Sequence, residues 1–93
     1  MTKFTTRVEL HDADWSEYSS LHAQMHRQGF TNTVTSGDGK LYELPPAEYN
    51  YEGTDTRSQV LDKAKAAATA VKKSFAIIVT ESAGRTWEGL SPA

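Results

Sequence analysis

The sequence contains no cysteine, so it has neither a disulfide framework nor a thiolate for catalysis or metal binding. It also shows no apolar run of membrane-spanning length and no amino-terminal pattern typical of a secretory signal. We therefore expect a cytoplasmic protein that does not insert into a membrane.

Neither sign of charge is in large excess. Ten lysines and arginines stand against twelve acidic residues, which gives a formal net charge of -2, and the isoelectric point is about 5.9. A dedicated nucleic-acid binder usually carries a basic surplus. The overall charge therefore argues against tight, non-specific binding to phosphates.

Large apolar residues are also few: Leu, Val, Ile and Phe together make up 16 of the 93 residues. A highly charged chain with so few would be disordered, but here the net charge is small and the periodicity is clear. We expect one folded domain over residues 1–93, with a thin core completed by tyrosine, tryptophan and alanine. A thin core also favours self-association, because a partner surface can complete the burial.

The amino-terminal third predicts a strand followed by a helix. Residues 4–10 alternate between apolar and polar, which is typical of a half-buried strand. Asp14 can cap the next helix, with Glu17 at N3 completing a capping box, and Gly29 can end it in the left-handed conformation. The apolar face of this helix recurs every three or four residues and comprises Trp15, Tyr18, Leu21, His22 and Met25.

The rest of the chain predicts three more strands and one more helix. Thr56 and Gln59 form a capping box in front of a helix whose apolar stripe is Val60, Ala64, Ala67 and Val71. The predicted strands are 31–36 with a hairpin extension at 41–44, then 47–52, 75–80 and, as a short optional fifth strand, 86–90.

This order, β-α-β-β-α-β, predicts an α+β protein with a ferredoxin-like fold. Two helices would cover one face of a four-stranded antiparallel sheet with strand order 4-1-3-2. The apolar strand 75–80 would then lie at an edge that contains no lysine or proline and invites another strand. We expect a homodimer in which the segment Thr86–Leu90 covers such an edge and shields Trp87.

His22 and His26 are the first candidates for chemistry, because a four-residue spacing puts them on one helix face. They suit general acid–base work on a phosphodiester, or metal binding without an obvious third ligand, or simply an exposed helix surface. Asp12, in the turn before the helix, offers a carboxylate for a divalent ion but equally suits a turn.

Aromatic and basic residues are the second set of candidates. Tyr49 and Tyr51 share one face of a predicted strand and, with Tyr42 and Trp87, could stack on unpaired bases or fill the core. The second helix is basic, which suits either phosphate contact or a solvated face; its cations are Arg57, Lys63, Lys65, Lys72 and Lys73.

From about Val8 to Val79 the chain resembles the type V toxin–antitoxin endoribonuclease antitoxins. The resemblance lies in the order of elements, in Tyr18-Ser19-Ser20 on the first helix, in Phe30 at its end, and in the spacing to the Tyr49–Tyr51 strand. It implies a ferredoxin-like fold similar to the CRISPR spacer-acquisition nucleases. It also implies a sequence-selective endoribonuclease that silences a membrane toxin by cutting its single-stranded transcript.

The resemblance also implies site residues. A basic residue midway along the first helix corresponds to His22 or His26, an aromatic on the third strand to Tyr49, and an acidic residue ending the first strand to Asp12. Histidine here replaces an arginine of the family, so protons can be moved but a permanent positive charge is missing.

Three hypotheses follow. The first is the endoribonuclease, with His22 and His26 as catalytic residues, Tyr49 and Tyr51 binding RNA, and no cofactor unless Asp12 recruits a divalent metal. The second is a non-catalytic, dimeric interaction or RNA-binding module that uses the tyrosine-bearing sheet. The third is a small metal-binding or ligand-binding protein.

Overall fold

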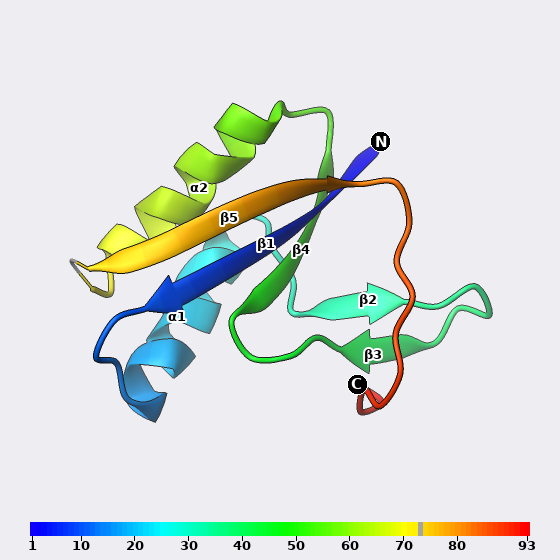
Figure 1. Cartoon of the computed structure of the whole chain (residues 1–93), viewed down its shortest axis with the longest axis horizontal. Coiled ribbons are helices and arrows are strands. Elements are labelled where there is room, and N and C mark those ends of the chain that lie inside the picture. The colour runs from blue at the N-terminus through cyan, green and yellow to red at the C-terminus, as the bar shows by residue number, and fades with distance from the viewer. Residues whose placement is uncertain (73) are drawn as a thin grey trace.

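The computed structural model describes residues 1–72 and 74–93, and they form an α+β structure, as predicted (Figure 1). Its helices are α1 (Trp15–Arg27) and α2 (Arg57–Thr69). Its strands are β1 (Thr2–Leu10), β2 (Thr33–Thr35), β3 (Leu41–Glu43), β4 (Glu48–Gly53) and β5 (Phe75–Ser82). None of the described helices is long and apolar enough to span a bilayer.

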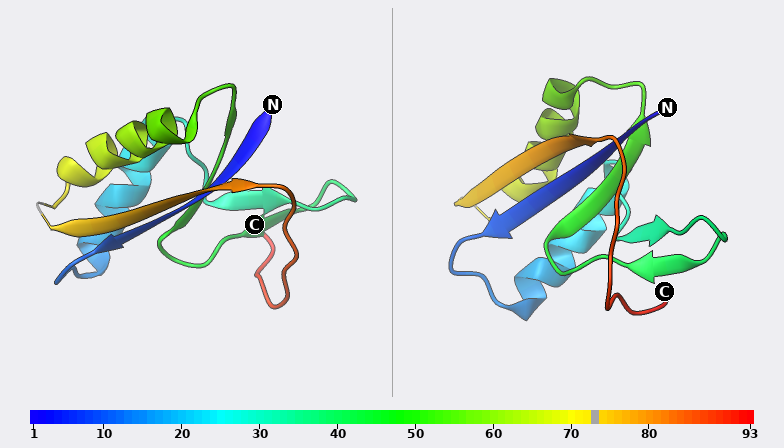
Figure 2. Two further views of the ribbon diagram at one scale, coloured as in Figure 1. Left: turned by 45° about the horizontal axis from the view of Figure 1, so that its top comes forward. Right: turned by 45° about the vertical axis from the view of Figure 1, so that its right-hand side comes forward.

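The main sheet has three strands in the order β4-β1-β5, and β1 is antiparallel to both of its neighbours. Both helices lie against the same face of this sheet (Figure 2). We call the opposite face, which alternate residues of the three strands form, the open face. The predicted central place of the first strand and the edge position of the 75–80 strand are confirmed.

The predicted four-stranded sheet is not formed. β2 pairs with β3 in a separate two-stranded sheet. Just before β2, Thr31 forms a single bridge to Asn50 of the main sheet, with N–H···O bonds of 2.9 and 2.7 Å. The tight turn after Thr35 folds the chain back so that β3 pairs with β2. The backbone groups of β2 that were expected to bond to β4 therefore bond to β3.

The predicted fifth strand at 86–90 is also absent. The carboxyl-terminal segment, residues 83–93, leaves the main sheet and ends beside β3, as Figure 2 shows. There the Glu43 N–H donates to Ser91 (2.8 Å) and the Ala93 N–H to Leu41 (3.0 Å). The ring of Trp87 lies 5.8 Å from that of Tyr42. This segment therefore covers the small sheet of its own chain and leaves the edge of β5 open.

The core lies between the main sheet and the helices. Its members are buried side chains of β1, both helices and β4, including Phe4, Val8, Leu21, Met25, Tyr49, Val60 and Ala64. Small alanines on α2 let that helix approach the sheet closely. One predicted member is wrong, because Trp15 in the first turn of α1 is 74% exposed.

The predicted helix ends are confirmed. Asp14 accepts a 2.9 Å hydrogen bond from the Glu17 N–H, and Thr56 accepts one of 3.2 Å from the Gln59 N–H. Both capping boxes are complete. At the end of α1, Gly29 has a φ of 93° and the Phe30 N–H donates to Met25 (3.0 Å), the geometry of a Schellman stop.

Candidate functional site

The predicted residues His22, His26 and Tyr49 meet at one hollow, which we call the histidine pocket. Its volume is about 460 Å³. The histidines reach it from α1, Tyr49 from β4, and residues 30–33 close the remaining side. One helical turn separates the two histidines, so both can line the same wall.

Tyr49 and His22 form the best-defined contact in this pocket. The phenol oxygen lies 2.6 Å from His22 Nδ1, and the two rings meet edge to face with centroids 5.5 Å apart. Burial raises the pKa of the Tyr49 hydroxyl well above its ordinary value of 10.0, and the nearby Tyr18 adds to this. The phenol is therefore protonated at neutral pH.

Burial also lowers the pKa of His22 below 6.5, so its ring is neutral at pH 7. A protonated phenol that donates to Nδ1 leaves the proton of the neutral ring on Nε2. His22 can thus offer an N–H donor from Nε2. His26 is exposed on the same pocket wall, where its ring can contact a bound molecule.

The two tyrosines do not present free faces to a base. Tyr49 is 1% exposed and Tyr51 is 7% exposed. Tyr51 also donates to Asp55 (3.0 Å) and accepts from Lys63 Nζ (2.5 Å). Base stacking, the role predicted for both, does not fit these packed rings; Tyr49 instead orients His22.

Asp12, the predicted metal ligand, is exposed in the turn before α1 and has a φ of 53°. Its carbonyl accepts a 2.8 Å hydrogen bond from Lys72. Within residues 1–72 and 74–93, no three side chains of the kinds that hold metals come together. Asp12 therefore has no partner ligands in the described structure.

Three of the basic residues predicted for the second helix face carboxylates, whereas the exposed Lys65 is in no ion pair of the described residues. Lys63 pairs with Asp55 at 3.1 Å, Lys72 pairs with Glu17 at 3.1 Å, and Arg57 lies 3.9 Å from Glu81. Lys73, also predicted as part of this face, lies outside the described residues. These pairs leave less positive charge for phosphates than the composition of the helix suggests.

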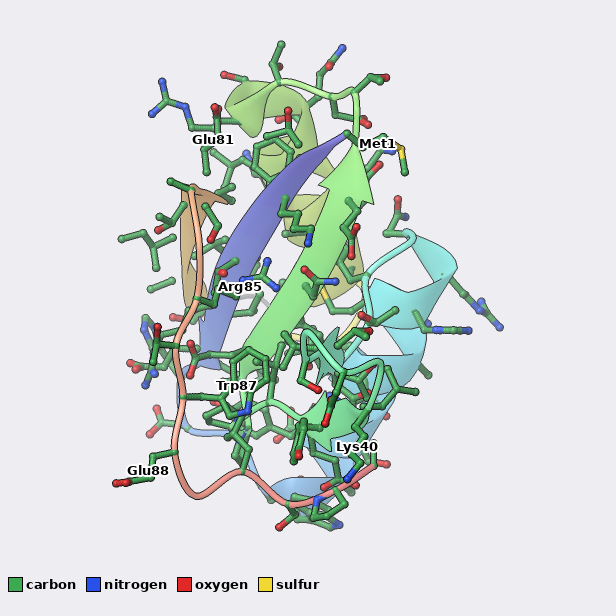
Figure 3. The ribbon with its side chains drawn as sticks, turned by 90° about the vertical axis from the view of Figure 1, so that its right-hand side faces the viewer. Met1, Lys40, Glu81, Arg85, Trp87 and Glu88 are labelled. Carbon is green, nitrogen blue, oxygen red and sulfur yellow. The ribbon has the colours of Figure 1, made fainter. Side chains whose placement is uncertain are left out.

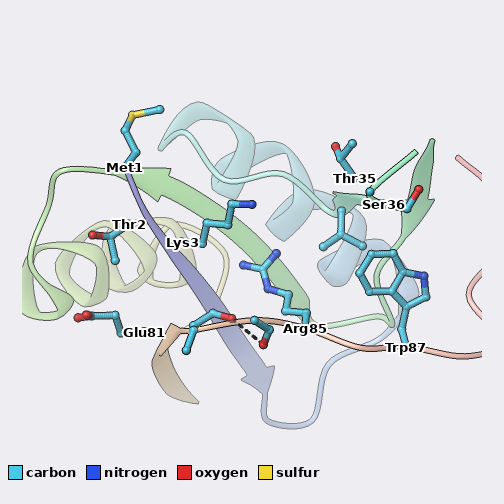
Figure 4. A pocket seen from close by; sticks show the side chains of 13 residues that line it. Met1, Thr2, Lys3, Thr35, Ser36, Glu81, Arg85 and Trp87 are labelled. Atoms are coloured by element: carbon cyan, nitrogen blue, oxygen red, sulfur yellow. Dashed lines mark hydrogen bonds between the residues drawn. The ribbon is translucent and has the colours of Figure 1, made fainter. Parts of the chain in front are cut away.

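The structure adds a second hollow that the sequence did not predict, and we call it the arginine groove. It has a volume of about 610 Å³ and lies between the amino-terminal end of β1, the β2 end of the small sheet and the carboxyl-terminal segment. The residues used below are Lys3, Thr35, Ser36, Arg85 and Trp87. Figure 3 shows Arg85 reaching from the carboxyl-terminal segment toward β1, and Figure 4 shows Lys3 and Trp87 on either side of it.

The sequence offered only a faint signal for this groove. Arg85 and Trp87 are two residues apart behind an apolar strand, a basic and aromatic pairing that suits nucleic acids. Lys3 stands at the other end of the chain, and only the antiparallel pairing of β1 with β5 brings it close.

Neither a protein-family model nor a curated protein matches this chain. Its function must therefore be inferred from the two hollows and from the residues that line them.

Proposed function

We propose that the protein is an endoribonuclease of the type V antitoxin kind, which cuts single-stranded RNA in the histidine pocket without a metal ion. The observation that carries the proposal is the 2.6 Å contact that fixes the half-buried His22 ring on the pocket wall that His26 also lines. A neutral donor and an exchangeable base on one wall are the groups that phosphodiester cleavage by an adjacent hydroxyl needs.

In this mechanism His26 removes the proton from the ribose 2′-hydroxyl. The 2′-oxygen bonds to phosphorus, the bond to the 5′-oxygen breaks, and the departing oxygen takes a proton from water. The Nε2–H of His22 donates to a non-bridging phosphate oxygen, where negative charge builds up. The products end in a 2′,3′-cyclic phosphate and a 5′-hydroxyl.

Tyr49 acts as a positioning residue. Its packed ring cannot move far, so its hydroxyl keeps His22 in one orientation and one tautomer. The residues that line this pocket include no arginine. The rigid support from Tyr49 lets the Nε2–H of His22 serve instead as the hydrogen-bond donor to the phosphate.

The order of the main sheet supports the resemblance. β4-β1-β5 with two helices on one face corresponds to three strands of a ferredoxin-like sheet. The fourth strand of such a sheet would lie beside β4, and we interpret the Thr31–Asn50 bridge as what remains of that pairing. An antitoxin of this kind would meet its transcript in the cytoplasm.

The test is cleavage of end-labelled single-stranded RNA by purified protein, with and without EDTA. We expect cutting that EDTA does not abolish, products with cyclic phosphate ends, and a loss of at least about a hundredfold in rate for His26→Ala, the range of general base catalysis. His11→Ala is the matched control, because His11 binds Ser74 away from the pocket. Cleavage that requires Mg²⁺, or that survives in the His22→Ala, His26→Ala double variant, contradicts the proposal.

A second candidate is a non-catalytic, dimeric binding module. The observation that favours it is the open edge of β5, where Ile78 is 62% exposed. An apolar edge strand without lysine or proline is suited to pair with its copy. Sedimentation at increasing concentration tests this: a dimer that Ile78→Lys converts to monomer supports it, and a monomer throughout rejects it.

A further inference from the structure

We infer that the arginine groove binds a nucleotide unit of single-stranded RNA, with Arg85 and Lys3 on the phosphate and Trp87 against the base. This inference rests on the proposed function for the identity of the ligand as RNA. It adds a binding site on the open face of the sheet to the cleavage site beside α1.

Arg85 is held in place before any ligand arrives. Its Nε donates to Thr5 Oγ1 at 2.9 Å, and its Nη2 donates to the Phe4 carbonyl at 3.1 Å and to Asn50 Oδ1 at 2.6 Å. Asn50 is itself oriented, because its amide nitrogen donates to Glu52 at 3.2 Å. A guanidinium fixed in this way loses little side-chain entropy on binding an anion.

The partners of Arg85 are all neutral oxygens. Within residues 1–72 and 74–93 no carboxylate comes within ion-pair distance of it. Glu52 acts on the guanidinium only through space, and burial lowers the pKa of Arg85 in spite of it. A half-buried cation without a direct ion pair is costly, and proteins usually pair such cations. The Nε and Nη2 groups of Arg85 are used to hold the carboxyl-terminal segment on β1. The two N–H donors of its Nη1 have no partner in the described structure.

Lys3 extends the positive charge of Arg85. It lies on the open face of β1, two residues before Thr5 and opposite Glu52 of β4, and it lines the same groove, whereas Glu52 does not. Figure 4 shows both cationic side chains on the same side of β1. Glu81, the acidic residue of the groove, faces Arg57 at 3.9 Å. The groove therefore suits an anion.

Trp87 points to a nucleotide rather than a simple anion. Its ring packs at a tilt against Tyr42 and also lines the groove. An indole beside two cations offers a base a stacking surface and offers its phosphate a charge partner. The hydroxyl of Thr35 also lines the groove and can bind sugar or base edges, whereas that of Ser36 already bonds to Asp38.

β2 contributes residues to both hollows. Thr33 lines the histidine pocket, whereas Thr35 lines the arginine groove. Two residues of a strand span about 7 Å. One RNA strand that crosses β2 can therefore place one nucleotide in the groove and a neighbouring one at the histidines.

Binding is tested separately from cutting with a fluorescent 2′-O-methyl oligoribonucleotide, which lacks the nucleophile and cannot be cleaved. We expect Trp87→Ala to weaken binding between about fivefold and a hundredfold, the range of one stacked base. Lys3→Ala should weaken it several-fold, and Arg85→Lys should do the same, since lysine keeps the charge but loses the planar fork.

Matched controls separate the groove from general effects. Lys65→Ala removes the same charge from the exposed surface of α2, and Trp15→Ala removes the other tryptophan, which lies on the surface of α1. Neither should change the affinity more than twofold. Thermal melts show whether each variant folds. If Arg85→Lys does not fold, the binding test relies on Lys3→Ala.

The Trp15→Phe variant leaves Trp87 as the sole tryptophan, so its fluorescence reports on the groove directly. Quenching by the oligonucleotide but not by inorganic phosphate supports the inference. Equal loss of affinity in Lys3→Ala and Lys65→Ala, or quenching by phosphate alone, overturns it. If the protein cleaves RNA but the oligonucleotide does not quench Trp87, the groove proposal is rejected and the endoribonuclease proposal stands. If the oligonucleotide quenches Trp87 but RNA is not cleaved, the endoribonuclease proposal is rejected and RNA binding in the groove stands.

Discussion

Tyr49 serves the core and the candidate site with one side chain. Its ring packs against Phe30, with centroids 6.5 Å apart, while its hydroxyl is directed to His22. This double use explains why a residue predicted to stack on RNA is buried: the pocket needs a donor that does not move, and the core supplies the rigidity.

The Tyr49→Phe variant separates these two roles. It keeps the ring, so the stability should change by no more than about 1 kcal/mol, the net value of one hydrogen bond. It removes the donor that favours neutral His22, so the pKa of His22 should rise toward 6.5. An NMR titration of the imidazole signals measures this, with Tyr42→Phe as control; an unchanged pKa would show that burial alone sets it.

Thr6 is the one buried side chain with an unsatisfied polar atom among the described residues. Its side chain is fully buried on the helix face of β1. Thr6→Val keeps the branched shape and removes the orphan hydroxyl, so it should stabilise the fold by about 1 kcal/mol, or raise the melting temperature by about 4–8 °C. A lower melting temperature would mean that the hydroxyl has a partner in solution.

At the scale of elements, Asp55 links β4 to α2. It accepts a hydrogen bond from Tyr51 of β4 and pairs with Lys63 of α2. The hydrogen bonds from Lys63 and Tyr51 lower the pKa of this carboxyl below 3.8.

Because the folded pKa of Asp55 is depressed, its contribution to stability is present above about pH 3.8 and lost as the pH falls through the folded pKa. Asp55→Asn should therefore flatten the fall in stability below pH 4, while the exposed Asp62→Asn should not. Urea unfolding at several pH values measures both slopes. Parallel slopes in the wild type and Asp55→Asn would contradict this assignment.

The β2–β3 sheet depends on the carboxyl-terminal segment. Two-stranded sheets are marginal in water, and here Ser91, Ala93 and Trp87 provide the additional contacts to β3. A chain ending at Ser82 should keep the main sheet and core but lose protection of the β2 and β3 amides in hydrogen exchange. Unchanged exchange at Val34 and Tyr42 would show that the hairpin is stable by itself.

At the scale of the whole molecule, a net charge of -2 hides a local excess of positive charge. Arg57, Lys63 and Lys72 face carboxylates. Lys3 and Arg85 share a groove that Glu81 lines but Glu52, the cross-strand neighbour of Lys3, does not. The average over the sequence therefore says little about where an anion can bind.

This arrangement predicts a shallow salt dependence. Two phosphate-binding cations on a single strand give a slope of about -1.4 in a plot of log affinity against log salt concentration. Lys3→Ala should reduce its magnitude by about 0.7, and Lys65→Ala should leave it unchanged. Anisotropy titrations at four salt concentrations measure the slope; a much steeper value would indicate diffuse binding over the surface.

The sequence by itself determined the parts of the fold that obey local rules. Capping boxes begin α1 and α2, and Gly29 ends α1, because those signals act within a few residues. Alternation identified β1 and β4, and an apolar run identified β5. The four-residue spacing of His22 and His26 put both on one helix face, which lines one pocket. The turn at residues 36–40 likewise predicted the hairpin of β2 and β3. Only the tertiary structure decided that this hairpin stays out of the main sheet, that residues 83–93 cross to the small sheet, and that Lys3 and Arg85 line one groove. These depend on which of several competing edges and surfaces a distant segment reaches, and no local pattern encodes that competition.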